Sequence, residues 1–274
     1  MYSVLDKDTI ENKIVPHLPE QKRGFPPCVP LSEIISAILY KLKTGIQWAL
    51  LPVKSLFSST ILSWQSVYYH FRKFSKRGVW KDCWTKLILT KKVSLDLSSC
   101  DLDGSHTPAI KGGEAVGYQG RKKRKTTNAL YLTDRQGLPL AMSVPEAGNH
   151  HDLFEIKTHF GEILASLESA NISVDGLFIN ADSGFDSKEL RSICEQNSIK
   201  PNFAQNKRNA NEDDDLYFDE LLYQERYAIE RTNAWLDGFR SLLNRFDTTI
   251  ASWESMNYIA FMVIALRKFK KRKV

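Results

Sequence analysis

Two kinds of charged residue come together near the middle of the sequence. Asp101 and Asp103 stand at the end of a strand-like segment, and a run of basic residues follows soon afterwards. Carboxylates bind metal cations and basic side chains bind anions, so the combination fits a ligand that brings both a metal ion and negative charge. A phosphodiester is such a ligand. The basic run consists of Arg121, Lys122, Lys123, Arg124 and Lys125.

Two further carboxylates would complete a cation site with Asp103. Asp182 directly follows a short apolar segment, and Glu230 lies in a helix-forming segment further along. Three carboxylates held close together repel one another, and divalent cations relieve that repulsion. Two Mg²⁺ ions about 3.5–4 Å apart, with Mn²⁺ as a substitute, would activate water or a 3′-hydroxyl and stabilise the leaving oxygen. We therefore expect Asp103, Asp182 and Glu230 to form a catalytic, metal-binding triad.

The first part of the chain is expected to be helical. Apolar residues at helical spacing predict helices over 31–45, over 58–78 with Ile61 inward, and over 79–91. Residues 31–92 hold eleven basic residues against two acidic ones, a net charge of +9. Three short helices with a basic face are typical of helix-turn-helix DNA binders, but a helical bundle with a solvated basic face would show the same pattern. The basic face of the second helix includes Arg72, Lys73, Lys76 and Arg77.

After residue 92 the pattern becomes extended. Strands are predicted over 94–104 and in a hairpin over 128–144 that turns at 134–137. The predicted order of elements then runs helix 153–168, strand 177–181, helix 187–197, strand 200–203, helix 218–246 and helix 252–270. This order predicts an α/β fold with a ribonuclease-H-like mixed sheet flanked by helices, preceded by a small all-helical region. In that fold the first and fourth strands are neighbours, which would bring Asp103 and Asp182 together beneath the helix of Glu230.

Several motifs carry a family resemblance. They are LKTGIQWALLP, VYYHFRKFSKRGVW, DLDGSHTP, KGGEAVGYQGRKKRKTTN, GNHHDL, NADSGFDS and RYAIERTNAWLDGFRSLLNRFD. Because these motifs occur together in this order, the chain resembles bacterial insertion-sequence transposases of the DDE class along nearly its whole length. The resemblance implies that residues 1–92 bind DNA ends and that residues 93–274 form the catalytic domain.

The activity that the resemblance implies is transposition. Such proteins bind the terminal inverted repeats of their element, hydrolyse double-stranded DNA at its ends and join the freed 3′-hydroxyls to target DNA. A homodimer on DNA is the expected assembly. The metal-binding triad of the family corresponds to Asp103, Asp182 and Glu230.

The C-terminal signature of the family is present with one departure. Tyr223, Arg226 and Glu230 match in type and spacing and would share one helix face, where Tyr223 and Arg226 are expected to contact DNA. Arg226 suits a bidentate phosphate contact, although a plain ion pair with Glu230 would give the same spacing. The family often has a lysine where this chain has Asp237. Its candidate replacements are Arg231 and Arg240.

Other carboxylates compete for the same roles. Asp101 would point to the same face as Asp103 if the segment is a strand. We prefer Asp103 because the resemblance aligns it and because it lies nearer the end of the predicted strand. Asp186 is expected to cap the helix that follows it. Glu225 would face away from Tyr223 and Arg226.

Two further motifs suggest different chemistry. His150, His151 and Asp152 could bind a transition metal, but adjacent histidines rarely point at one ion, and a loop that positions DNA or the next helix is the alternative. The glycine-rich segment 112–120 is not a nucleotide-binding loop because no Gly-Lys-Ser/Thr follows it. It fits a flexible loop near DNA, and a solvated basic turn is the alternative.

Composition agrees with an ordinary globular protein. The 274 residues are 42% hydrophobic and 26% charged, with a net charge of +6, which favours polyanionic partners. The four cysteines form no C-x-x-C pair, which indicates reduced thiols rather than a zinc site. No targeting signal is evident, and the longest apolar run is too short to span a bilayer. We therefore expect a cytoplasmic protein with no membrane partner.

Two alternative functions stay open from the sequence. A catalytically silent, element-derived DNA-binding protein would keep the basic helices but lose triad carboxylates, whereas all three are present here. A ribonuclease-H-like DNA nuclease would cut DNA without joining ends. The presence of Asp237 also leaves room for a transposase of weakened activity.

Overall fold

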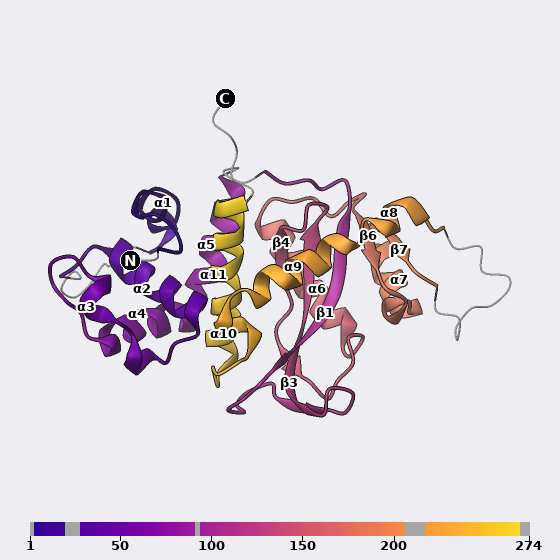
Figure 1. Cartoon of the computed structure of the whole chain (residues 1–274). Coiled ribbons are helices and arrows are strands. Elements are labelled where there is room, and N and C mark those ends of the chain that lie inside the picture. The colour runs from indigo at the N-terminus through magenta and orange to yellow at the C-terminus, as the bar shows by residue number, and fades with distance from the viewer. Residues whose placement is uncertain (1–2, 20–27, 91–93, 206–216, 269–274) are drawn as a thin grey trace. The chain divides into compact units, whose positions relative to one another are not determined.

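The chain folds into two compact units. The computed structural model describes residues 3–19, 28–90, 94–205 and 217–268 (Figure 1). One unit combines Met1–Ser94 with Leu236–Val274, and the other is Leu95–Trp235. The last part of the predicted catalytic region therefore packs with the N-terminal helices rather than with the sheet. The functional boundary after residue 92 stays a prediction.

The first unit is helical. Its longest helix, α11, is buried from Trp253 to Leu266 on nearly all sides and packs against α2, α4, α5 and α10. A helix that is apolar all round must be enclosed by other elements, which explains this central place. The helices are α1 (Lys7–Lys13), α2 (Leu31–Thr44), α3 (Val53–Leu56), α4 (Trp64–Lys76), α5 (Val79–Leu89), α10 (Arg240–Leu243) and α11 (Ile250–Lys268), with single turns η1 (Val15–His17) and η2 (Trp48–Leu50).

Local signals explain where the helices of this unit begin and end. Gly45 ends α2 with a φ of 67°, as predicted, and its N–H donates to the Lys41 carbonyl over 2.9 Å. The predicted start of the second helix was wrong. Ser63 caps α4 by accepting a hydrogen bond from the Ser66 N–H, so Ile61 lies outside the helix and is 53% exposed.

The second unit is built on a mixed sheet. Among the described residues its central order is β2-β3-β1-β6-β7, and β4 and β5 also pair with β3. β1 runs antiparallel to β3 and parallel to β6, and β6 is parallel to β7. The strands are β1 (Cys100–Pro108), β2 (Gly117–Gln119), β3 (Arg124–Asp134), β4 (Pro139–Met142), β5 (Glu146–Ala147), β6 (Phe178–Ala181) and β7 (Lys200–Phe203).

Helices flank this sheet. In Figure 1, α9 crosses in front of the strands and α6 lies behind them. The helices are α6 (Ile156–Ser169), α7 (Lys188–Gln196), α8 (Glu220–Gln224) and α9 (Tyr227–Asp237), with the single turn η3 (Ser183–Phe185). The predicted fold class, a ribonuclease-H-like mixed sheet preceded by helices, is confirmed. In the described part of the chain, no helix is long and apolar enough to cross a membrane.

Three details of the chain after residue 94 differ from the prediction. The single long helix predicted over 218–246 is three shorter helices, α8, α9 and α10. β1 continues to Pro108, so Asp103 lies inside the strand rather than at its end. Part of the glycine-rich segment, which was expected to be a flexible loop, forms β2 and pairs with β3.

Candidate active site

Asp103 lies where β1 passes beneath α9. Its Oδ1 accepts a hydrogen bond from the Gly104 N–H over 2.9 Å, and its Oδ2 accepts one from Asn233 Nδ2 over 3.2 Å. Burial raises the pKa of Asp103 to about 6, and the charges of Glu230 and Asp182 act in the same direction. Mutual repulsion of this kind requires proximity. Glu230 and Asp182 therefore each lie within electrostatic range of Asp103.

Glu230 reaches this region from the first turn of α9. Its side chain is 63% exposed, and its Oε1 lies 4.0 Å from Nη2 of Arg226. The guanidinium of Arg226 also lies 5.8 Å from the centre of the Tyr223 ring. Because the Arg226 N–H donates to the Tyr223 carbonyl, the turn continues across the break between α8 and α9. The three signature residues therefore stay together although the predicted helix is interrupted.

Asp182 stands at the carboxyl end of β6, as predicted. It caps the single turn η3, where its Oδ1 accepts a hydrogen bond from the Gly184 N–H over 2.8 Å. Its side chain is partly exposed. An aspartate held by one backbone hydrogen bond keeps its second oxygen for another ligand.

The neighbouring carboxylates have other partners. Asp101 is 1% exposed and its Oδ1 accepts a hydrogen bond from Asn180 Nδ2 over 2.9 Å, which favours Asp103 over Asp101 as the metal ligand. Glu225 is paired with Arg135. The predicted cap role of Asp186 was wrong, because Ser187 caps α7 and Asp186 pairs with Arg191 at 2.7 Å.

The donor set fits a divalent cation chemically. Mg²⁺ takes oxygen ligands, and positive charge would stabilise the ionised form of Asp103, whose pKa is raised by burial. Within the described residues, however, no three His, Cys, Asp or Glu side chains lie close enough to hold a metal ion. Glu230 and Asp182 each influence Asp103 electrostatically, but the three carboxylates do not lie close enough together to hold one ion.

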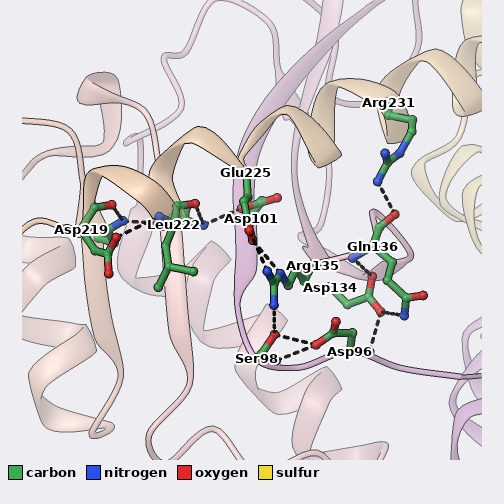
Figure 2. Close-up of polar contacts among 12 residues, drawn as sticks. Asp96, Ser98, Asp101, Asp134, Arg135, Gln136, Asp219, Leu222, Glu225 and Arg231 are labelled. Carbon is green, nitrogen blue, oxygen red and sulfur yellow. Dashed lines mark hydrogen bonds and ion pairs between the residues drawn. The ribbon is translucent and has the colours of Figure 1, made fainter.

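The turn between β3 and β4 holds α9 from another face (Figure 2). Arg135 donates two hydrogen bonds to Glu225, from Nε over 2.6 Å and from Nη2 over 2.7 Å. Thr232 Oγ1 donates to the carbonyl of Gly137, whose φ is 85°. A Cβ on Gly137 would lie 2.8 Å from the Ala228 carbonyl oxygen. Only glycine fits this close approach of turn and helix without strain.

Arg231 belongs to the same contact. Its Nη2 donates to the Gln136 carbonyl over 2.7 Å, and its guanidinium lies between the rings of Tyr227, at 5.4 Å, and Trp235, at 5.5 Å. Figure 2 shows Arg231 directed at the turn. A guanidinium engaged in this way favours a role in holding α9 over the predicted DNA contact.

The GNHHDL motif supports β1 beside Asp103. Asp152 Oδ1 accepts a hydrogen bond from Asn128 Nδ2 over 2.8 Å and lies 3.7 Å from His106 Nε2. A Cβ on Gly104 would come within 2.2 Å of the same oxygen. Sequence reasoning did not find the roles of Asp152 and Asn233. The glycine directly after Asp103 was the available signal of a close approach.

The two histidines of that motif have separate partners. The ring of His150 stacks on Phe154 with centroids 3.7 Å apart, and His151 Nδ1 accepts a hydrogen bond from the Leu153 N–H over 3.2 Å. The two rings thus have different neighbours. Of the two interpretations of this motif, the geometry favours a positioning loop over a histidine metal site.

The predicted DNA-contacting residues lie on surfaces of both units. In the second unit the basic run forms the turn between β2 and β3 and the first two residues of β3. All five of its side chains are exposed. In the first unit Arg72, Lys76 and Arg77 are exposed on or just beyond α4, and Arg240 is exposed at the start of α10. Lys73 is partly buried, with its Nζ 6.0 Å from the Tyr69 ring centre.

The fold and the carboxylates define a ribonuclease-H-like α/β protein with a candidate metal-dependent site. Residues 95–265 match the family model "Transposase DDE domain", and residues 11–84 match "Putative transposase of IS4/5 family (DUF4096)". The chain therefore belongs to the DDE transposase family. A search of curated proteins gave no match.

The matches among solved structures include complexes of two transposases. A piggyBac transposase synaptic complex with hairpin DNA matches with 9% identity and a TM-score of 0.47, covering 100% of this chain and 78% of the other. The Mos1 transposase paired-end complex with left transposon end matches with 11% identity and a TM-score of 0.30, covering 92% and 83%. The Mos1 strand transfer complex gives 12% identity and 0.29, covering 89% and 79%.

Proposed function

We propose that this DDE-family protein is an active transposase. It binds the terminal inverted repeats of an insertion sequence as a homodimer, cleaves double-stranded DNA at the element ends and joins the freed 3′-hydroxyls to target DNA. The observations that support this most are the hydrogen bond from Asn233 on α9 to Asp103 on β1 and the charges of Glu230 and Asp182, which act on Asp103. A group of this kind fits metal-dependent phosphoryl transfer.

The three carboxylates share one role in the proposed mechanism. Asp103, Asp182 and Glu230 would hold two Mg²⁺ ions, with Mn²⁺ as a substitute, and bound ions would supply activation of the attacking group and charge stabilisation at phosphorus. Asn233 and the Gly104 N–H hold the Asp103 carboxylate from both oxygens, which limits its rotation. Fixing the ligand before the metal arrives lowers the entropy lost on binding.

Arg226 is the proposed phosphate contact beside the carboxylates. Its guanidinium lies near Glu230 and the Tyr223 ring, and its charge opposes the raised pKa of both Asp101 and Asp103. A guanidinium in this position can bind a phosphodiester oxygen bidentately while the carboxylates face the metal. Tyr223 would then limit the directions in which Arg226 can extend.

The basic surfaces of the two units are proposed to bind the DNA backbone. The exposed turn 121–125 would serve the catalytic unit, and the basic face of α4 would serve end recognition. Contacts of this type add affinity without reading sequence and weaken as salt is raised. Arg240 is a further candidate contact on the first unit.

The test is a cleavage and joining assay on DNA that carries the element's own flanking ends. With Mg²⁺, the parent protein should cut at the ends and join them to target DNA, while Asp182→Ala and Glu230→Ala should bind the ends but perform neither step. Cutting without joining would instead indicate a nuclease. Binding with no cutting in Mg²⁺ or Mn²⁺ would indicate a catalytically silent DNA-binding protein, and Asp237→Lys would be tested next for recovery.

A further inference from the structure

A ladder of buried polar side chains crosses three parallel strands next to the candidate active site. Asp101 on β1, Asn180 on β6 and Asn202 on β7 occupy one rung of the sheet. Asn180 Nδ2 donates to Asp101 Oδ1 over 2.9 Å, and Asn202 Nδ2 donates to Asn180 Oδ1 over 2.8 Å. The three residues are at most 1% exposed. We call them the polar ladder.

The polar ladder also binds the start of α8. The Asp219 N–H donates to Asn202 Oδ1 over 2.7 Å, and Asn202 Nδ2 donates to the Asp219 carbonyl over 2.9 Å. Asn180 Nδ2 also approaches the Leu222 carbonyl at 3.3 Å. Figure 2 shows Asp101 beside the segment of Asp219 and Leu222. The first turn of α8 is thus held to β6 and β7 through its own backbone.

The path from α8 to Glu230 is continuous. The Glu225 N–H donates to the Leu222 carbonyl, the Arg226 N–H to the Tyr223 carbonyl, and the Ile229 N–H to the Arg226 carbonyl. These successive turns leave little freedom between α8 and α9. A shift of α8 relative to the sheet would therefore move Glu230.

The polar ladder also relates the two catalytic aspartates. Asp101 and Asn180 pair directly between parallel strands, and each precedes a proposed metal ligand, Asp103 or Asp182, by two residues. Residues two apart in a strand point to the same face. A slip of one residue between β1 and β6 would break this rung and separate the aspartates.

The burial of the polar ladder is unusual, because apolar side chains normally fill buried positions in a sheet. Desolvating an amide or carboxylate is unfavourable unless its hydrogen bonds are restored, and apolar replacements of similar shape are often as stable. A polar ladder whose hydrogen bonds are all made favours one register between the strands and one position of α8 on the sheet.

We propose that Asn180 and Asn202 are positioning residues that set the three metal-binding carboxylates relative to one another. Asn180 sets the register of the two aspartate-bearing strands, and Asn202 sets α8 and through it Glu230. This inference rests on the proposed function, since it assigns Asp103, Asp182 and Glu230 to one metal site. It predicts that breaking the ladder weakens metal binding without touching a metal ligand.

The test compares Asn202→Ala with the parent in two measurements. Mn²⁺ binding is followed by electron paramagnetic resonance on the protein without DNA, and end cleavage is followed over a range of Mg²⁺ concentrations. We expect the half-saturating Mn²⁺ concentration to rise about tenfold, as for other residues that orient metal ligands. The maximal cleavage rate should fall by a similar factor, and the concentration of DNA at half-maximal rate should not change.

A stability-matched control separates positioning from general weakening. Leu167→Ala and Ile163→Val remove buried atoms from α6 without altering any ladder residue, and the variant whose thermal midpoint is nearest that of Asn202→Ala is used. That control should keep the parent's Mn²⁺ half-saturation. If Asn202→Ala does not fold, Asn202→Ser is used, which keeps one hydrogen-bonding group. Its half-saturating Mn²⁺ concentration should rise, but by less than about tenfold.

Two outcomes would overturn the inference. One is an unchanged Mn²⁺ half-saturation in the folded Asn202 variant, and the other is an equal rise in the matched control. A parent protein that neither binds Mn²⁺ nor cleaves DNA would contradict the proposed function instead. The two failures are therefore distinguishable in one set of measurements.

Discussion

Asn233 on α9 donates a hydrogen bond from Nδ2 to Oδ2 of Asp103 on β1 over 3.2 Å, across 130 positions of sequence. It stands three residues after Glu230 and therefore on the same side of the helix. One helix face thus supplies a proposed metal ligand and also holds a second one. This links the position of α9 directly to the geometry of the carboxylates.

Replacement of Asn233 should affect catalysis more than stability. Asn233→Ala removes one hydrogen bond at a partly exposed place, for which we expect a loss of about 1 kcal/mol in the free energy of unfolding. Because Asp103 can then rotate, the maximal cleavage rate should fall about tenfold. Cleavage assays over a Mg²⁺ titration, with chemical denaturation, measure both.

The matched control for Asn233 is Gln196→Ala. Gln196 lies exposed on α7, where its side-chain amide donates a hydrogen bond to Ser192 Oγ one helical turn earlier. The maximal cleavage rate and the free energy of unfolding should both stay at the parent level in that variant. A full cleavage rate in Asn233→Ala would show that Asp103 needs no support from α9.

Gly137→Ala should loosen α9 from the turn between β3 and β4. The added Cβ would lie 2.8 Å from the Ala228 carbonyl oxygen at a φ of 85°, so both close contact and backbone strain oppose it. We expect a loss of about 1–3 kcal/mol in the free energy of unfolding. Because the turn contacts the helix of Glu230, end cleavage should weaken as well.

Variants of two other glycines separate the effect of close contact from the effect of backbone strain. Gly176 has a φ of 76° but open space around its Cβ position, and Gly120 has open space without a positive φ. Gly176→Ala should therefore lose stability through backbone strain but keep cleavage, and Gly120→Ala should stay within about 0.5 kcal/mol of the parent. Equal stability of Gly137→Ala and Gly120→Ala would contradict the close packing of turn and helix.

The basic turn should contribute to DNA affinity in a salt-dependent way. Replacing Lys123, Arg124 and Lys125 by alanine removes up to three phosphate contacts, so the slope of log affinity against log salt should fall by up to about 0.9 per contact. The same loss is expected for specific and unrelated DNA, because phosphate contacts carry no sequence information. Filter binding at several salt concentrations measures the slope.

A triple variant of equal charge change serves as the control for the basic turn. Lys157, Lys188 and Lys200 are exposed on α6, α7 and β7, and none of them belongs to the turn between β2 and β3. Their replacement by alanine should leave the salt slope nearly at the parent value. If both triple variants lower the slope equally, net charge rather than the turn explains the binding.

Much of the fold follows from local pattern. The apolar segment before Asp182 predicts a buried strand, and the polar residues 134–137 between two apolar runs predict the hairpin. Gly45 predicts the end of α2. Since the order of strands and helices then selects the architecture, the neighbourhood of Asp103 and Asp182 could be expected from the sequence.

The parts that the sequence did not predict depend on distant contacts. No glycine or proline marks the break between α8 and α9, where Glu225 instead turns toward Arg135. Several serines precede α4, and only the backbone decides that Ser63 is its cap. The bond from Asn233 to Asp103 has no local signature, because its two ends meet only after the sheet and α9 have packed.

The most direct test of the central claim is Mn²⁺ binding to a set of single carboxylate variants, followed by electron paramagnetic resonance. Asp103→Asn, Asp182→Asn and Glu230→Gln should each weaken Mn²⁺ binding at least about tenfold, since each removes a charged ligand. Asp186→Asn removes the same charge from a carboxylate that pairs with Arg191, and Glu195→Gln removes it from an exposed position on α7; both variants should leave binding near the parent value. Equal weakening in all five variants, or none in the first three, would contradict a single metal site formed by Asp103, Asp182 and Glu230.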